Sequence, residues 1–343
     1  MARNTNSEGV MKIAFYPSDR TACSWQRAWF PGFWLKKLGL ADVRMVYGPV
    51  QEEAVWADLS VYQRHYDPGS PLAWWNELGK LGKKRAYELD DDIFCMPHDN
   101  PFRVYFDGPV KTAMKQMLRE ADVVICSTSG LAMAMRRFNE NVTVCPNGID
   151  PQVFDLPVTR DPEKTKIFFV GSRTHDRDFA LALPALKKLL KDNRDVQLYF
   201  VGDAPTKIAP ELPFPAQVFY TKWIPFEELY VRLAELGPDI IIAPLTDHPF
   251  NQRKSAIKWL EASALGAVTI ASPISDFKKF CVHGETALLV NSPGEWEDAL
   301  AWMVSDKDAR LKIAAQATAV VKAKFSYDVL ASRWAAVLSE VLK

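Results

Sequence analysis

The sequence has 343 residues, of which 48% are hydrophobic, and its 42 Lys and Arg residues equal its 42 Asp and Glu residues in number. Single hydrophobic cores rarely grow beyond about 250–300 residues, so this length predicts two domains. The zero net charge, without any run of five like charges, disfavours a general nucleic-acid binder or a protein held on anionic membranes.

The N-terminus and the cysteines point to a cytoplasmic protein. Residues 1–11 are polar and precede the first apolar run, so they predict a disordered start with neither a secretory signal nor a membrane span. The five cysteines are scattered without a C-x-x-C pair, which argues against a disulfide framework or a zinc site. A cytoplasmic location without stable membrane insertion is therefore expected.

The first half of the chain alternates short apolar runs with segments of helical periodicity. The expected strands are residues 12–16, 43–47, 59–62, 85–89, 123–126 and 142–145. Helical periodicity is clearest over 109–120 and 129–138. This alternation is typical of a parallel sheet with helices on both faces. Residues 12–152 are accordingly expected to form one α/β domain.

A second series of the same kind follows residues 153–165, a polar, proline-containing stretch interpreted as an interdomain linker. The expected strands are 166–171, 196–202, 218–220, 239–245, 268–271 and 287–290, and the helices that close the chain are 294–304, 307–324 and 327–342. The second domain thus spans 166–325, and 326–343 holds the last helix. In doubly wound sheets ligands bind beyond the carboxyl ends of strands, so the site is expected in the loops after these strands.

Four stretches of the chain carry recognisable motifs. They are the turn PNGID at 146–150, the VGS loop at 170–172, the apolar strand at 196–202, and the stretch APLTDHPFNQRKSAIKWLEASALG at 243–266. Together they resemble the family-four (group 1) retaining glycosyltransferases of the GT-B class. The resemblance implies an α/β fold of two Rossmann-like, doubly wound domains facing a central cleft, with the C-terminal helix packing back on the N-terminal domain. It also implies that the second domain binds a nucleoside-diphosphate sugar and the first binds the acceptor.

The donor residues follow from this resemblance and from the chemistry of a diphosphate. A diphosphate leaving group gains negative charge, so its site needs fixed cations and backbone N–H donors. The family's basic pair falls on Arg173 and Arg177, while the helix that opens near Ser255 offers free amides and Lys258 adds a charge. The alternative is that these are solvated surface charges. The expected donor-binding residues are Gly171, Ser172, Arg173, Trp223, Ile224, Asn251, Lys254, Ser255, Ala256 and Glu261.

Two of these assignments leave an alternative open. Glu261 is expected at the nucleotide ribose, and the other reading is an ion pair with Lys258 three residues before it. Trp223 and Ile224 are expected at the nucleotide base, although a tryptophan packed in the core fits the sequence nearly as well. The chain also departs from the family at Arg253, which stands where the first, sugar-contacting glutamate is expected.

The expected catalytic residues are Arg177, Lys258, Asp91 and His175. Asp91 belongs to the triplet 90–92 after the strand 85–89, where a carboxylate can orient or deprotonate an acceptor hydroxyl; metal binding is the alternative. His175 is favoured over His98 as a hydrogen-bonding group, with Asp178 in reach to support it. The expected acceptor-binding residues are Ser24, Trp25, Arg27, Asp92 and His98, with core packing as the alternative for the aromatic cluster around Trp25.

These observations lead to one hypothesis and two alternatives. The hypothesis is a hexosyltransferase-like retaining enzyme that moves a sugar to an acceptor hydroxyl of a glycan, a lipid-linked glycan or another molecule, without a cofactor or metal. The first alternative is a phage-type transferase acting on hydroxymethylated DNA bases, in which nucleic acid enters only as acceptor. The second is a non-catalytic nucleotide-sugar-binding protein, because Arg253 replaces the expected glutamate. Metalloprotease, α/β-hydrolase and P-loop motifs are absent from the sequence.

Overall fold

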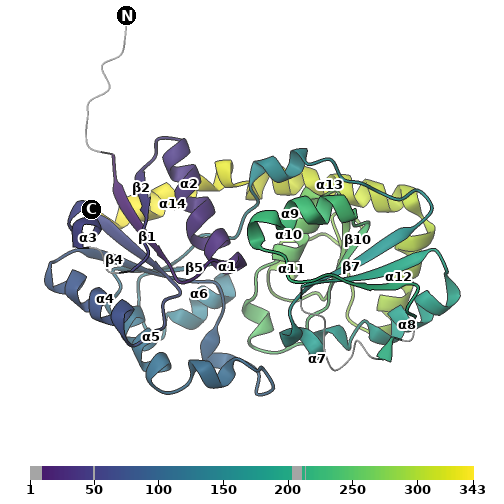
Figure 1. Ribbon diagram of the computed structural model, residues 1–343, viewed down its shortest axis with the longest axis horizontal. Helices are drawn as coiled ribbons and strands as arrows, with labels where there is room; N and C mark the ends of the chain where they lie inside the picture. Colours follow the sequence, from purple (N-terminus) through teal and green to yellow (C-terminus); the bar gives the residue numbers. More distant parts are fainter. Residues whose placement is uncertain (1–9, 49–50, 203–210, 213) are drawn as a thin grey trace, which may run out of the picture. The chain divides into compact units, whose positions relative to one another are not determined.

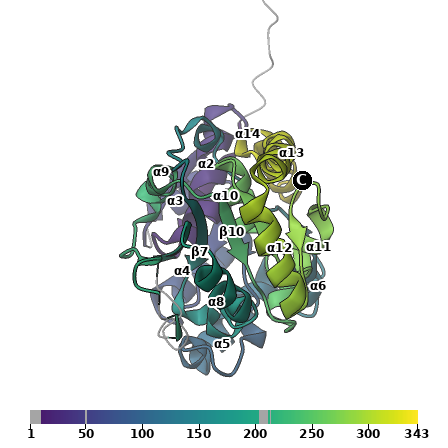
Figure 2. The same ribbon diagram turned by 90° about the vertical axis from the view of Figure 1, so that its right-hand side faces the viewer.

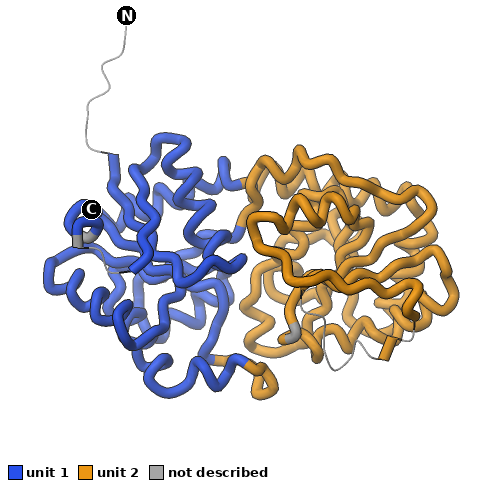
Figure 3. Tube along the Cα trace, in the orientation of Figure 1, with its two compact units in different colours: residues 1–94, 102–147, 327–343 blue, residues 95–101, 148–326 orange. Residues whose placement is uncertain are grey.

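The chain folds into two compact units, each built on a parallel sheet covered by helices. The computed structural model describes residues 10–48, 51–202, 211–212 and 214–343 (Figure 1; a second view is Figure 2). Of the expected disordered start, 1–11, residues 1–9 lie outside this range. As far as it is described, unit 1 comprises 1–94, 102–147 and 327–343, and unit 2 comprises 95–101 and 148–326 (Figure 3).

Unit 1 contains, among the described residues, a six-stranded sheet in the order β2-β1-β3-β4-β5-β6. Its strands are β1 (Lys12–Pro17), β2 (Asp42–Met45), β3 (Leu59–Gln63), β4 (Lys84–Leu89), β5 (Val123–Cys126) and β6 (Val142–Val144). All neighbours pair in parallel. The central strands are almost continuously buried, as expected for a parallel sheet with both faces covered.

Helices cover this sheet and include the last helix of the chain. They are α1 (Ala22–Ser24), α2 (Phe30–Lys37), α3 (Gln51–Trp56), α4 (Ser70–Lys80), α5 (Pro109–Glu120), α6 (Ser129–Met135) and α14 (Tyr327–Val341). A π-helical turn, Trp25–Trp29, joins α1 to α2. Trp334 and Leu338 of α14 are fully buried in one cluster with Phe15. The return of the C-terminal helix to the first domain is thereby confirmed.

Unit 2 contains, in its described part, a second six-stranded parallel sheet in the order β12-β11-β10-β7-β8-β9. Its strands are β7 (Thr165–Gly171), β8 (Val196–Gly202), β9 (Val218–Tyr220), β10 (Ile240–Ala243), β11 (Val268–Ala271) and β12 (Leu288–Leu289). Gly202 has φ +99°, and a Cβ on it would lie 2.3 Å from the carbonyl oxygen of Gly171. Glycine is therefore required where β7 and β8 end side by side.

The helices of unit 2 follow its strands, as in any doubly wound sheet. They are α7 (Asp176–Phe179), α8 (Leu183–Asp192), α9 (Phe226–Leu236), α10 (Ile257–Ala264), α11 (Ser275–Phe280), α12 (Pro293–Ser305) and α13 (Lys307–Phe325). α8 packs beside α12, and α10 packs beside α13 (Figure 2). Apolar residues of α8 and α12 share a buried cluster with β7, β8, β10 and β11.

The boundaries between the units differ from the expected ones. The stretch 153–165 is not a free linker, because Thr159 N donates to Ala234 O and Arg160 Nη2 donates to Leu265 O at 2.8 Å, both within unit 2. Residues 95–101, expected in the first domain, have their contacts in unit 2. Within the described ranges, no helix is both long enough and apolar enough to cross a membrane.

Candidate functional site

The strand order of unit 2 reverses between β7 and β10, which pair with each other in the sheet. The chain continues from β7 to β8 and β9 on one side, whereas β11 and β12 extend the sheet beyond β10 on the other. At such a reversal, the loops that leave the two strands diverge and open a crevice beyond the carboxyl ends. Here one loop leads into a 3₁₀ turn, Arg173–His175, and the other into a 3₁₀ turn, Asn251–Arg253.

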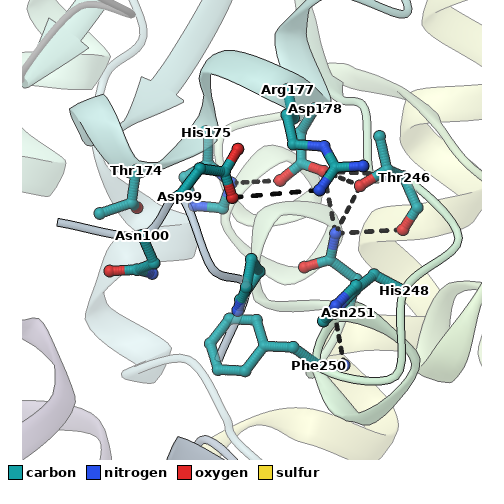
Figure 4. Close-up of a pocket in the computed structure, with 11 residues that line it drawn as sticks. Asp99, Asn100, Thr174, His175, Arg177, Asp178, Thr246, His248, Phe250 and Asn251 are labelled. Carbon is teal, nitrogen blue, oxygen red and sulfur yellow. Dashed lines mark hydrogen bonds and ion pairs between the residues drawn. The ribbon is translucent and has the colours of Figure 1, made fainter. Parts of the chain in front are cut away.

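A buried carboxylate, that of Asp178, ties these two loops together (Figure 4). Its Oδ1 accepts hydrogen bonds from the backbone N and the Oγ1 of Thr246, both at 2.8 Å, and from Asn251 Nδ2 at 2.9 Å. Its Oδ2 lies 2.8 Å from Nδ1 of His175. Asp178 therefore fixes residues of both loops at the point where the strand order reverses.

These hydrogen bonds also set the ionisation state of Asp178. Burial raises the pKa of its carboxyl, but hydrogen bonds from His175 and Thr246 outweigh burial, so the net pKa lies below its ordinary value. An ionised carboxylate only accepts hydrogen bonds, so Nδ1 of His175 carries a hydrogen and donates a hydrogen bond to Asp178. In the neutral ring, Nε2 of His175 is then the acceptor.

A polar cavity lies beside this network. It is lined by Pro97, Asp99, Asn100, Thr174, His175, Arg177, Asp178, Thr246, His248, Phe250 and Asn251 (Figure 4). Nη1 of Arg177 lies 3.9 Å from Oδ1 of Asp99, and the Arg177 side chain is 62% exposed. The guanidinium is therefore available to an anion that enters from solvent.

A second cavity shares His175 with the first. It is lined by Phe169, Val170, His175, Ile242, Ala243, Pro244, Leu245, Lys254, Ser255, Ile257, Lys258 and Phe277. The ends of β7 and β10 give it an apolar floor, and the two basic residues Lys254 and Lys258 also line it. α10 begins at Ile257, two residues after Ser255, so Lys258 lies in its first turn. Cations and helix amides thus meet in one cavity, which suits an anionic ligand.

Other expected donor residues lie close by in different surroundings. Glu261 is 3% exposed and accepts a hydrogen bond from Lys258 Nζ at 2.7 Å. The ion pair with Lys258, which was the alternative to ribose binding, is therefore present in this structure. Asn251 is buried, with its amide nitrogen held by Asp178 and Thr246. Ala256 caps α10, and Ser172 caps the turn that contains His175.

The remaining donor residues are placed less centrally. Gly171 ends β7 opposite Gly202. Trp223, 63% exposed, and the partly buried Ile224 follow the edge strand β9. The side chain of Arg173 lies outside the described part of the structure. Arg253, at the position of the expected glutamate, donates from Nη1 to Cys95 Sγ at 3.0 Å.

The sequence of this site is similar to that of a known family. Residues 164–306 match the family model described as glycosyl transferases group 1, and this match spans the loops after both β7 and β10. This part of the chain thus resembles the group 1 glycosyltransferases. Comparison with curated proteins finds no match.

Solved structures with the same architecture cover nearly the whole chain. HepE from Anabaena, in complex with UDP and glucose, has a TM-score of 0.69 at 13% identity and covers 96% of this chain and 100% of its own. Sucrose-phosphate synthase from Thermosynechococcus elongatus has a TM-score of 0.74 at 15% identity, covering 96% and 99%. A glycosyltransferase from Rickettsia africae has 0.69 at 16% identity, covering 97% and 99%. Identities this low show the fold alone, and they confirm the expected GT-B fold.

The acceptor-side residues expected in unit 1 are mostly buried. Arg27 and Glu88 are fully buried and form an ion pair at 2.6 Å, and Arg27 also donates to Asn147 Oδ1. Ser24 Oγ is buried against Gln63 Oε1 at 2.7 Å. Both side chains are buried in the interior of the unit, and contact with an acceptor stays a prediction for them.

The acidic triplet is likewise divided among separate partners. Asp92 is 1% exposed, and its Oδ1 accepts from Phe94 N at 3.0 Å and lies 3.7 Å from Arg137. Asp90 lies 3.6 Å from Arg64, and Asp91 is partly buried. Among the described residues, no group of three or more His, Cys, Asp or Glu side chains is arranged to hold a metal ion.

The other two acceptor candidates keep some exposure. Trp25 is partly buried, with its ring stacked on Trp29 at 5.3 Å. His98 is exposed and does not line the polar cavity, although its neighbours Pro97 and Asp99 do.

Several residues of the polar cavity were not predicted from the sequence. Thr246 and His248 follow the strand β10, and that position is itself a signal for a ligand loop. Asp99 and Asn100 carry no comparable signal, because only tertiary contacts bring residues 95–101 to unit 2.

Proposed function

We propose that the enzyme transfers a sugar from a nucleoside-diphosphate sugar bound in unit 2 to an acceptor hydroxyl, with retention of anomeric configuration. One observation carries the proposal: two cavities share His175 at the carboxyl ends of β7 and β10, one lined by Lys254 and Lys258, the other by Arg177. The diphosphate fits the first cavity because of its cations, and the sugar then reaches across His175 into the second.

The proposed chemistry requires little more than positioning and charge. The bond between the anomeric carbon and the diphosphate oxygen breaks, and negative charge grows on the leaving phosphate. Lys258, Lys254 and the amides at the start of α10 stabilise that charge. The acceptor oxygen attacks on the same face of the sugar and passes its proton to the leaving phosphate oxygen. His175, oriented by Asp178, offers Nε2 as an acceptor to a hydroxyl group beside the reacting bond.

The proposal also specifies the donor, the metal requirement, the location and the acceptor. HepE was crystallised with UDP-glucose, so a UDP-hexose is the first donor to test. Lysine and arginine side chains provide the neutralisation that a metal ion otherwise supplies, so we propose transfer without a metal. We also propose that the enzyme acts in the cytoplasm, and that the acceptor is a glycan, a lipid-linked glycan or a comparable hydroxyl compound.

Calorimetry with UDP and UDP-glucose, with and without EDTA, tests this function. We expect both ligands to bind, with affinities that EDTA does not change. UDP should be released when an acceptor is added, and the anomeric proton of the product should show the same coupling constant as that of the donor sugar. Lys258→Ala should weaken UDP binding about tenfold or more, because a desolvated charge-assisted contact is lost. The control is Lys187→Ala on α8, which removes an exposed ammonium paired with Glu211. Equal affinity of wild type and Lys258→Ala would contradict the assignment.

A further inference from the structure

Residues 95–101 reach unit 2 from the middle of the unit 1 sequence. The chain on either side of them, up to Phe94 and from Phe102, belongs to unit 1 (Figure 3). Cys95 within the segment accepts a hydrogen bond at 3.0 Å from Arg253, the residue that stands in place of a glutamate. Arg253 therefore anchors residues 95–101 through a hydrogen bond that a glutamate at this position could not donate.

The anchored segment brings a carboxylate and an amide to the polar cavity. Asp99 and Asn100 line it together with His248 and Thr174 (Figure 4). Oδ1 of Asp99 faces the guanidinium of Arg177 at 3.9 Å, and the Asp99 side chain is 48% exposed. The other carboxylate of the lining, Asp178, is 7% exposed and already accepts hydrogen bonds from His175, Thr246 and Asn251. Asp99 is thus the lining carboxylate that a ligand can reach.

The chemistry of this wall suits a polyhydroxylated ligand. A carboxylate accepts hydrogen bonds from two neighbouring hydroxyl groups, and an amide both donates and accepts. A site built from such groups discriminates strongly between ligands that present hydroxyls and ligands that lack them. His175 lines both cavities, so a group joined to a diphosphate in the cationic cavity extends toward Asp99.

We propose that Asp99, assisted by Asn100, recognises the hydroxyl groups of the donor sugar, so that the residues 95–101 determine sugar specificity. This inference rests on the proposed function, in which the diphosphate occupies the cavity of Lys254 and Lys258. It assigns the sugar contact to a segment remote in sequence from the group 1 domain at 164–306.

A competing account makes Asp99 only a partner for Arg177. In that account the carboxylate holds the guanidinium until a diphosphate displaces it, and removal of Asp99 frees Arg177 for any nucleotide. The two accounts differ in what happens to UDP and UDP-glucose. Loss of a sugar contact affects UDP-glucose alone, whereas release of Arg177 strengthens the binding of both equally.

The test is the ratio of the dissociation constants for UDP-glucose and UDP, measured by calorimetry on wild type and Asp99→Ala. We expect the ratio to rise about tenfold in Asp99→Ala while UDP affinity is retained or improved. Asp99→Asn, which keeps a hydrogen-bonding oxygen, should give an intermediate ratio. Asp195→Ala removes a 75% exposed carboxylate that pairs with Lys164 at 2.6 Å and does not line the polar cavity, and it should leave the ratio unchanged.

Each remaining outcome overturns a defined claim. A ratio unchanged in Asp99→Ala, with UDP still bound, overturns the role of Asp99 and leaves the proposed function standing. A parallel gain in both affinities supports the competing account and equally overturns the inference. Wild-type protein that binds neither UDP nor UDP-glucose overturns the proposed function and this inference together. Retained UDP binding also reports that the variant is folded.

Discussion

At the scale of single residues, Asp178 matters most because one buried carboxylate serves both ligand loops. It accepts hydrogen bonds from His175, Thr246 and Asn251, the last two of which follow β10. Asp178→Asn replaces an acceptor by a group that donates from one side, so at least one buried donor loses its partner. We expect a loss of about 2–3 kcal/mol of stability and a fall in kcat/KM of about tenfold to a hundredfold. Thermal unfolding and the rate of UDP release measure the two effects.

The effect of Asp178 on stability depends on pH in a defined direction. Its pKa is lowered in the folded protein, so the carboxylate contributes stability above the pKa of the unfolded chain and loses it as the pH falls through the folded value. The gap in unfolding temperature between wild type and Asp178→Asn should therefore be largest near pH 7 and should shrink below about pH 4. Asp192→Asn, an exposed residue at the end of α8, should show no gap at either pH. A gap that persists unchanged in acid would contradict this account.

Sequence reasoning found the residues that carry local signals and missed those placed by tertiary contacts. His175, Lys254, Ser255 and Lys258 follow strands, and the structure brings them to the adjoining cavities. The predicted support of His175 by Asp178 is present as a hydrogen bond. The burial of Arg27 was not foreseen, because its partner Glu88 lies 61 positions away on the strand β4. Two residues that pair across so long a stretch of sequence produce no recognisable spacing pattern.

At the scale of elements, the stretch 153–165 shows why composition misleads about linkers. Its polar residues and prolines suggested an interdomain linker, yet Arg160 docks it onto unit 2. Nη2 of Arg160 donates to Leu265 O at 2.8 Å and to Gly266 O at 2.7 Å, at the carboxyl end of α10, and Nε lies 3.6 Å from Asp239. A cation at the end of a helix also interacts favourably with the helix dipole. The segment is thus a fixed part of the unit that supports α10.

Arg160→Lys should destabilise unit 2 although it keeps the charge. Lysine cannot reproduce the planar guanidinium that reaches two carbonyl oxygens and a carboxylate at once, so we expect a loss of about 1–3 kcal/mol. Because α10 carries Lys258, UDP affinity should also fall, by a fewfold. Chemical denaturation and calorimetry provide the two readings. Arg232→Lys, at an exposed residue of α9 paired with Glu235, is the matched control and should change stability by less than about 0.5 kcal/mol. Equal effects of the two substitutions would refute the docking role of Arg160.

At the scale of the whole molecule, the alternation of strands and helices was sufficient to predict two parallel α/β units, because each strand is a short apolar run between turn signals. The crossings of the chain between units were harder to predict. Residues 327–343 return to unit 1 as expected from the resemblance, whereas 95–101 join unit 2 without any sequence signal. One consequence is that unit 1 stays incomplete until the C-terminal helix has been made, since Trp334 and Leu338 belong to its core.

Trp334→Ala should accordingly destabilise unit 1 although it lies near the end of the chain. The indole is fully buried, its ring centre is 6.2 Å from that of Phe15, and the guanidinium of Arg27 lies 5.3 Å above it. Removing such a side chain costs about 3–5 kcal/mol, because the cavity left behind cannot collapse completely. Differential scanning calorimetry with and without UDP assigns the unit 2 transition as the one that the nucleotide shifts. The other transition should fall in Trp334→Ala and stay in place in Trp302→Ala, which removes an indole that is 41% exposed on α12. A lowered UDP-sensitive transition in Trp334→Ala would show instead that α14 stabilises unit 2.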